Sequence, residues 1–187
     1  MKTYIFNTIM SLLTIFLVSC SNSGLESEIS GIMDTKIIIP FEKLDKRECS
    51  FFKDTLDSPH QFTLVVYLEG IKCTSCELSE LSEMEKSNSD DDLWRRTYKV
   101  FIISSDPENV DDLYALLCNQ RIKNDVFLDT CGIFRKTNPI IPDSKLFHSF
   151  VLDGENKVIL VGNPFKNYKL KELFSRIVEE EMTKRRK

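Results

Sequence analysis

The chain is poor in glycine, proline and histidine and has no excess of positive charge. Its 187 residues include 6 Gly, 6 Pro and 2 His, and 25 Lys and Arg against 29 Asp and Glu give a net charge of −4. So little glycine and proline argues against a disordered or collagen-like chain. The acidic balance offers no attraction to nucleic-acid phosphates, so nucleic acid is not an expected partner.

Several catalytic motifs are also missing. The sequence has no G-x-S-x-G, no G-x-x-x-x-G-K and no P-x-x-x-T-x-x-C. Their absence disfavours a serine hydrolase, a phosphate-loop enzyme and a peroxidase. After residue 20, no run is long and apolar enough to span a bilayer, which takes about 20 apolar residues.

The first twenty residues have the outline of a bacterial lipoprotein signal. Lys2 gives a positive start, an apolar run follows from Ile5 to Val18, and Ser19-Cys20 closes it. We expect residues 1–19 to be removed and Cys20 to be lipidated as the new N-terminus. Residues 20–34 then form a lipidated N-terminus and flexible tether, and residues 35–187 form the folded domain. The chain is expected in the cell envelope, anchored to a bacterial membrane and facing the periplasm or the cell exterior.

Apolar patterning predicts an α/β domain with alternating strands and helices. A nearly continuous apolar run, Phe62–Leu68, is the expected central strand. The last two strands form a hairpin around Asp153-Gly-Glu-Asn156. The expected strands are 36–40, 62–68, 98–103, 126–128, 147–152 and 157–161, and the expected helices are 76–84, one beginning after Asp106-Pro107, and 168–184.

Two cysteines with two residues between them carry the chemistry. Cys73 and Cys76 follow the central strand and open a helix, which brings two thiols within reach of a disulfide. Backbone N–H groups at a helix N-terminus favour thiolate over thiol, so Cys73 is the expected nucleophile. Cys76, one helical turn on and expected to be less exposed, resolves the mixed disulfide.

With this motif the chain resembles the thioredoxin-like superfamily, and more narrowly the TlpA-like lipoproteins of Bacteroidetes. Residues 64–76 and the late hairpin, residues 150–162, carry the resemblance. It implies a central mixed sheet flanked by helices and a monomeric, cofactor-free thiol:disulfide oxidoreductase. Its partners are then protein thiols or disulfides, with Cys73 as nucleophile and Cys76 as resolving thiol. Whether it reduces or oxidises its partners stays open.

The chain departs from this family at three places. Phe147-His148-Ser149 stands where a cis-proline usually precedes the late strand, and Tyr67 replaces a buried acid. Glu69 is a candidate substitute for that acid, with a solvated strand-end carboxylate as the alternative. Lys72 replaces the usual tryptophan and either favours the Cys73 thiolate by its charge or is simply solvated.

His148 opens a second interpretation. An imidazole beside two thiols is a soft site suited to copper or zinc, and SCO copper chaperones are similar, although three residues separate their cysteines. The alternative function is therefore a copper-binding protein using Cys73, Cys76 and His148. His148 as a base beside the dithiol, or as a strand residue with satisfied hydrogen bonds, also stays open.

A non-catalytic interaction lipoprotein is the third hypothesis, with a structural disulfide in place of a reactive one. The remaining cysteines carry smaller expectations. Cys118 is expected to be a small buried hydrophobe, with a disulfide to Cys131 as the alternative, and Cys49 is unassigned.

Overall fold

A computed structural model describes residues 23–47, 61–69, 74–88, 90–120 and 122–185. The chain divides into two compact units, residues 1–31 and 32–187. From Ser23, the segment expected as a flexible tether is helical, α2 (Ser23–Ile32). Within the described ranges, no helix has both the length and the apolar character needed to cross a bilayer.

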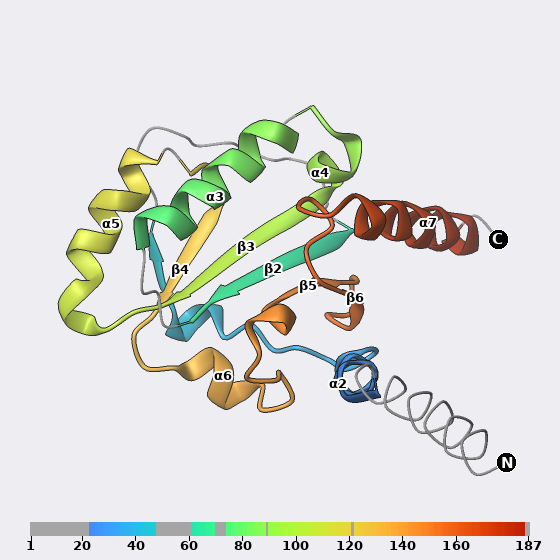
Figure 1. Cartoon of the computed structure of the whole chain (residues 1–187), viewed down its shortest axis with the longest axis horizontal. Coiled ribbons are helices and arrows are strands. Elements are labelled where there is room, and N and C mark those ends of the chain that lie inside the picture. Colours follow the sequence, from blue (N-terminus) through green and yellow to red (C-terminus); the bar gives the residue numbers. More distant parts are fainter. Residues whose placement is uncertain (1–22, 48–60, 70–73, 89, 121, 186–187) are drawn as a thin grey trace, which may run out of the picture. The chain divides into compact units, whose positions relative to one another are not determined.

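The second unit is built on a six-stranded mixed sheet with strand order β1-β4-β3-β2-β5-β6 (Figure 1). Strands β2, β3 and β4 are parallel to one another. Strand β1 runs antiparallel to β4, β5 runs antiparallel to β2, and β6 runs antiparallel to β5. This confirms the predicted central mixed sheet. The strands are β1 (Asp45–Arg47), β2 (Phe62–Leu68), β3 (Thr97–Ser104), β4 (Asp125–Asp129), β5 (Ser149–Leu152) and β6 (Val158–Val161).

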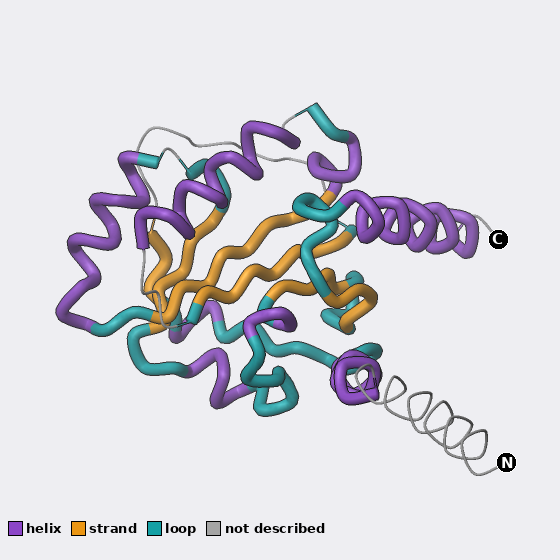
Figure 2. The backbone as a smooth tube through the Cα atoms, viewed as in Figure 1, coloured by secondary structure: helices purple, strands orange, loops and turns teal. Residues whose placement is uncertain are grey.

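Helices cover both faces of the sheet (Figure 2). Successive residues of β2 point to opposite faces: Leu64 and Val66 face the core that contains Leu81 of α3, while Val65 faces the core that contains Phe134 of α6. Because apolar residues cover both faces, residues 64–67 of β2 are buried without interruption. The remaining helices are α3 (Thr74–Asn88), α4 (Asp92–Arg96), α5 (Val110–Asn119), α6 (Ile133–Thr137) and α7 (Tyr168–Arg185), with short 3-10 turns η1 (Phe41–Lys43), η2 (Pro107–Asn109) and η3 (Lys145–Phe147).

The predicted first strand, residues 36–40, is wrong. Only an isolated bridge between Lys36 and Lys157 forms there, and β1 lies further on, at Asp45–Arg47. The Asn138 side chain binds both backbone polar groups of Ile38. Its Oδ1 accepts the Ile38 N–H at 2.9 Å, and its Nδ2 donates to the Ile38 carbonyl at 2.8 Å. With these groups bonded to a side chain, and with no N–H on Pro40, the segment cannot extend a ladder.

The late hairpin is confirmed, with a turn chemistry that differs from the simplest expectation. The positive φ of the turn, 64°, falls on Asn156 and not on Gly154. Asp153 Oδ1 accepts the backbone N–H groups of Glu155 and Lys157. These two hydrogen bonds to the Asp153 side chain close the turn. The left-handed conformation falls on Asn156, and asparagine tolerates it better than most residues.

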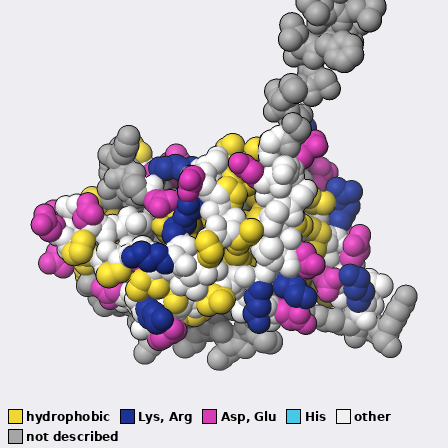
Figure 3. All heavy atoms as spheres, turned by 90° about the horizontal axis from the view of Figure 1, so that it is seen from below, with side chains coloured by type: hydrophobic (Ala, Val, Ile, Leu, Met, Phe, Trp, Pro, Cys, Tyr) yellow, Lys and Arg dark blue, Asp and Glu magenta, His cyan; other side chains and the backbone are white. Residues whose placement is uncertain are grey.

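The surface carries charges of both signs. On the face shown in Figure 3, acidic and basic side chains alternate among apolar ones. This mixture matches the small net charge of the sequence, −4, and gives that face no single-sign field for a polyanion.

Lys99 is a buried cation in the β3 strand, 4% exposed. Its Nζ donates to the Trp94 carbonyl at 2.9 Å and lies 4.5 Å from the Trp94 ring centroid. Burial lowers the pKa of Lys99 to about 8, against an opposing attraction from Glu85. The folded state therefore holds an ammonium in an unfavourable place at neutral pH.

Replacing Lys99 with Met is expected to stabilise the fold at pH 7, as measured by urea unfolding. Between about pH 8 and 10 the unfolded chain keeps a proton that the folded chain releases, so the wild type gains stability as pH rises. The advantage of Lys99→Met should then shrink by at most about 1.4 kcal/mol per pH unit. Lys169→Met, at an exposed site on α7, serves as the control. A difference that stays constant from pH 7 to 10 contradicts the account.

Candidate functional site

The carboxyl ends of the parallel strands meet at one edge of the sheet. Leu68 pairs with Ile103, and Ser104 pairs with Asp129, so the residues after β2, β3 and β4 leave the sheet side by side. Strand β5 runs the other way and begins at this edge, with Ser149 opposite Val66. The topology therefore gathers Glu69, Cys131 and His148, residues far apart in the sequence, at one end of the sheet.

Cys76 lies in the first turn of α3, the helix that follows β2, and is exposed. The strand-then-helix context predicted for the two cysteines is confirmed for Cys76. That Cys76 is less exposed than Cys73 stays a prediction, because only Cys76 lies within the described residues. Cys73 and Lys72 lie outside the described residues, as do Cys20 and Cys49.

His148 stands immediately before β5, at the C-terminal end of η3. Its carbonyl accepts the Tyr67 N–H at 2.7 Å, which extends the pairing of β2 and β5 to the edge of the sheet. The described residues contain no cis peptide bond, so neither Pro139 nor Pro142 is the cis-proline that the family resemblance implies. A trans-linked histidine occupies that place.

The imidazole of His148 is buried, 3% exposed. Its Nε2 is 3.1 Å from the Pro142 carbonyl and 3.5 Å from Arg135 Nη1. Arg135 Nη1 donates to the carbonyls of Ile141 and Pro142 at 2.9 and 2.8 Å, which accounts for its hydrogens. Nε2 is therefore assigned the imidazole hydrogen, and Nδ1 is a buried acceptor with no partner in the structure.

Helix α6 holds Arg135 in place, and sequence reasoning missed both. The buried Asp129 carboxylate accepts the backbone N–H groups of Ile133 and Phe134 at 2.8 and 2.9 Å, which satisfies donors at the start of a short helix. Gly132, with a φ of 63°, makes the turn before it. The signal lay in Asp129 and Gly132, an acid and a turn residue just before the helix.

Tyr67 is also buried, and its ring centroid lies 5.3 Å from that of His148. Burial and the nearby Glu69 charge raise the pKa of Tyr67 to about 12, so the phenol is neutral. The nearby Ser104 hydroxyl has the opposite effect and lowers this pKa. The two hydroxyl groups are not placed to form a hydrogen bond, so the Tyr67 hydroxyl has no partner. Glu69 is partly exposed, and its Oε2 is 4.0 Å from His148 Nε2.

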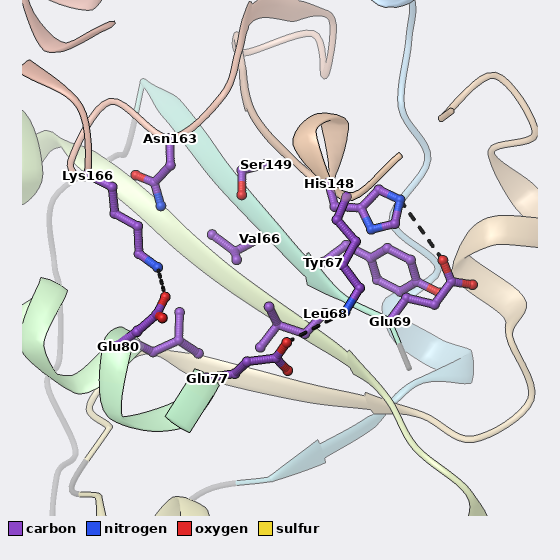
Figure 4. Close-up of a pocket in the computed structure, with 12 residues that line it drawn as sticks. Val66, Tyr67, Leu68, Glu69, Glu77, Glu80, His148, Ser149, Asn163 and Lys166 are labelled. Carbon is purple, nitrogen blue, oxygen red and sulfur yellow. Dashed lines mark hydrogen bonds and ion pairs between the residues drawn. The ribbon is translucent and has the colours of Figure 1, made fainter. Parts of the chain in front are cut away.

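A cavity of about 200 Å³ opens between β2, the first turns of α3 and the start of β5 (Figure 4). Two ion pairs stand across it: Lys166 to Glu80 at 2.8 Å, and Lys145 to Glu77 at 3.6 Å. Its lining residues are Val66, Tyr67, Leu68, Glu69, Glu77, Glu80, Leu81, Lys145, His148, Ser149, Asn163 and Lys166.

The other described cysteines differ from expectation. Cys118 is half of a disulfide, so it is not the free buried thiol expected by default. Cys131 is a free, exposed thiol, so a disulfide between Cys118 and Cys131 is wrong. Among the described residues, no group of three or more His, Cys, Asp or Glu could hold a metal ion. The predicted copper set includes Cys73 and so falls partly outside them.

The parallel β2, β3 and β4 with their helices, followed by an antiparallel hairpin and a C-terminal helix, define a thioredoxin-like α/β fold. No protein-family model and no curated protein matches the sequence. Solved structures match at low identity.

One is a thioredoxin-like protein from Porphyromonas gingivalis, with 16% identity over 78% of this chain and 92% of that chain and a TM-score of 0.47. Another is the thioredoxin domain of a thiol-disulfide oxidoreductase from Bacteroides vulgatus, with 12% identity over 61% and 79% of the two chains and a TM-score of 0.42. StoA from Bacillus subtilis has 15% identity over 63% and 84%, with a TM-score of 0.41. At these values the similarities do not carry an activity to this chain.

The neutral state of His148 is testable. Burial, the largest cause, lowers the pKa of His148 below its usual 6.5. Below about pH 6.5 His148 binds a proton in the unfolded chain but stays neutral in the folded chain, so the free energy of unfolding should fall as the pH drops through this range. His148→Gln keeps a donor for the Pro142 carbonyl and should remove this pH dependence. Urea unfolding from pH 5 to 7.5 measures it, and an equal slope in both proteins contradicts it.

Proposed function

We propose that the chain is a membrane-anchored thiol:disulfide oxidoreductase that exchanges disulfides with extracytoplasmic proteins through Cys73 and Cys76. The observation that carries the proposal is the place of Cys76: it is exposed in the first turn of α3, directly after the central parallel strand β2. A helix N-terminus favours thiolate over thiol.

The exchange conserves atoms and electrons. The Cys73 thiolate attacks one sulfur of a partner disulfide, forming a mixed disulfide and releasing the other sulfur as a thiolate. The Cys76 thiol loses its proton and attacks Cys73, which releases the partner as a dithiol and leaves a Cys73–Cys76 disulfide. A second, reduced protein dithiol must then reduce that disulfide. The reverse sequence oxidises the partner, and the relative potentials decide the direction.

Two further observations support an oxidising compartment and a lipid anchor. Cys118 is disulfide-bonded, and structural disulfides are rare in the cytosol. The sequence places Cys20 at the end of an apolar run with the pattern of a lipoprotein signal.

Trapping of partners tests the exchange. In Cys76→Ser the resolving thiol is gone, so mixed disulfides through Cys73 should accumulate and be visible on non-reducing gels. Cys131→Ser is the matched control, because Cys131 is an exposed free thiol that also follows a strand end at this edge. Equal trapping by both variants, or none by Cys76→Ser, argues against the proposal.

The anchor has its own test. Labelled palmitate fed to whole cells should be incorporated into the wild-type chain but not into Cys20→Ala, because that variant has no thiol to take a diacylglyceryl group. Equal incorporation of the label into both proteins rules out lipidation at Cys20.

A further inference from the structure

We propose that the cavity beside the first turns of α3 receives an arginine or lysine side chain of the partner protein. This inference rests on the proposed function, because it names a chemical feature of the proteins that the dithiol acts on. The cavity measures about 200 Å³, which is below the roughly 300–1,000 Å³ of small-molecule pockets. At roughly 30 Å³ per water it holds about seven waters, which is room for one long side chain.

The cavity is lined by buried acceptors that lack donors. Glu77 Oε2 is buried and has no hydrogen-bond partner, and neither has Nδ1 of the buried His148. Because Nε2 of His148 faces the Pro142 carbonyl at 3.1 Å, Nδ1 presents a lone pair. Buried polar atoms nearly always have partners. A ligand that brings N–H donors supplies what these two atoms lack.

The charges around the cavity favour a cation. Glu80 is tightly paired with Lys166, at 2.8 Å, but Glu77 has only a loose pair with Lys145, at 3.6 Å. Glu69 lies 4.0 Å from His148, whose pKa is lowered by burial, so at neutral pH this imidazole does not balance the Glu69 charge. Among the residues that line the cavity, three carboxylates therefore face two ammonium groups.

Arginine and lysine match this lining better than other side chains. A guanidinium carries five N–H donors and no acceptor, and an ammonium carries three donors. An acidic side chain adds an acceptor where acceptors already lack donors, and an apolar one leaves Glu77 Oε2 unsatisfied. Lys145, with a side chain 63% exposed, is the chain's own cation at the rim and competes for Glu77.

Peptide substrates that differ at one residue test the inference. The full lipidated chain, in detergent micelles, is given disulfide-bonded peptides with Arg, Gln or Glu beside the cysteine. The wild type should show about tenfold higher kcat/KM for the Arg peptide than for the Glu peptide, as expected for one charge-assisted hydrogen bond. Glu77→Gln should reduce this ratio to about twofold, whereas Lys145→Gln should increase it.

Glu83→Gln is the matched control, because Glu83 is exposed on the same helix and does not line the cavity. It should keep the tenfold ratio. Equal kcat/KM for the Arg and Glu peptides in the wild type, or an unchanged ratio in Glu77→Gln, overturns the inference while leaving the exchange activity in place.

Binding of cysteine-free peptides separates the two proposals. With Ser in place of Cys, the Arg peptide should still bind more tightly than the Glu peptide in a fluorescence polarisation assay, and Glu77→Gln should abolish the difference. If that preference appears but no peptide disulfide is exchanged, the inference stands and the proposed function fails. If exchange occurs without any preference in binding or rate, the inference fails alone.

Discussion

The pairing of β2 with β5 is the constraint on which the candidate site depends. Strand β2 runs parallel to β3 and antiparallel to β5, so its carboxyl end meets the beginning of β5. The 2.7 Å hydrogen bond from Tyr67 N–H to the His148 carbonyl is the last contact of this pairing. A shift of one residue would turn every β5 side chain to the opposite face, and His148 would leave the candidate site. The buried residues on both faces of β2 and β5 hold this register.

A second support comes from the short helix α6. Asp129 ends β4 and binds the first N–H groups of α6, and α6 presents Arg135, which also pairs with Asp143. Through two backbone carbonyls Arg135 holds the loop that carries Pro142 against the imidazole. His148 is thus oriented by a chain of three groups, which are the Asp129 carboxylate, the Arg135 guanidinium and the Pro142 carbonyl. Charge-assisted hydrogen bonds are stronger than neutral ones and set geometry well, which explains how a histidine is accommodated where the resemblance implies a cis-proline.

The elements that could be predicted are those with strong local patterns. The apolar run Phe62–Leu68, the helix carrying Cys76 and the late hairpin are confirmed because buried strands, helix starts and turns leave periodic or positional signals. Strand 36–40 is wrong because the backbone of Ile38 binds a distant side chain, Asn138, which no local pattern reveals. The two lysines that line the cavity, Lys145 and Lys166, could not be predicted for the same reason. Lys145 lies in η3 and Lys166 in the turn before α7, both more than fifty residues after the end of α3, and only the topology brings them to Glu77 and Glu80.

The redox equilibrium of Cys73 and Cys76 is the most direct test of this account. The full chain is equilibrated in glutathione or dithiothreitol buffers of known potential, the thiols are alkylated, and each cysteine is mapped by mass. A reversible couple confined to these two residues, with a potential above about −300 mV, is the predicted result. A pair that remains oxidised well below that value is a structural bridge and contradicts the account, and so does a pair that forms no disulfide at all.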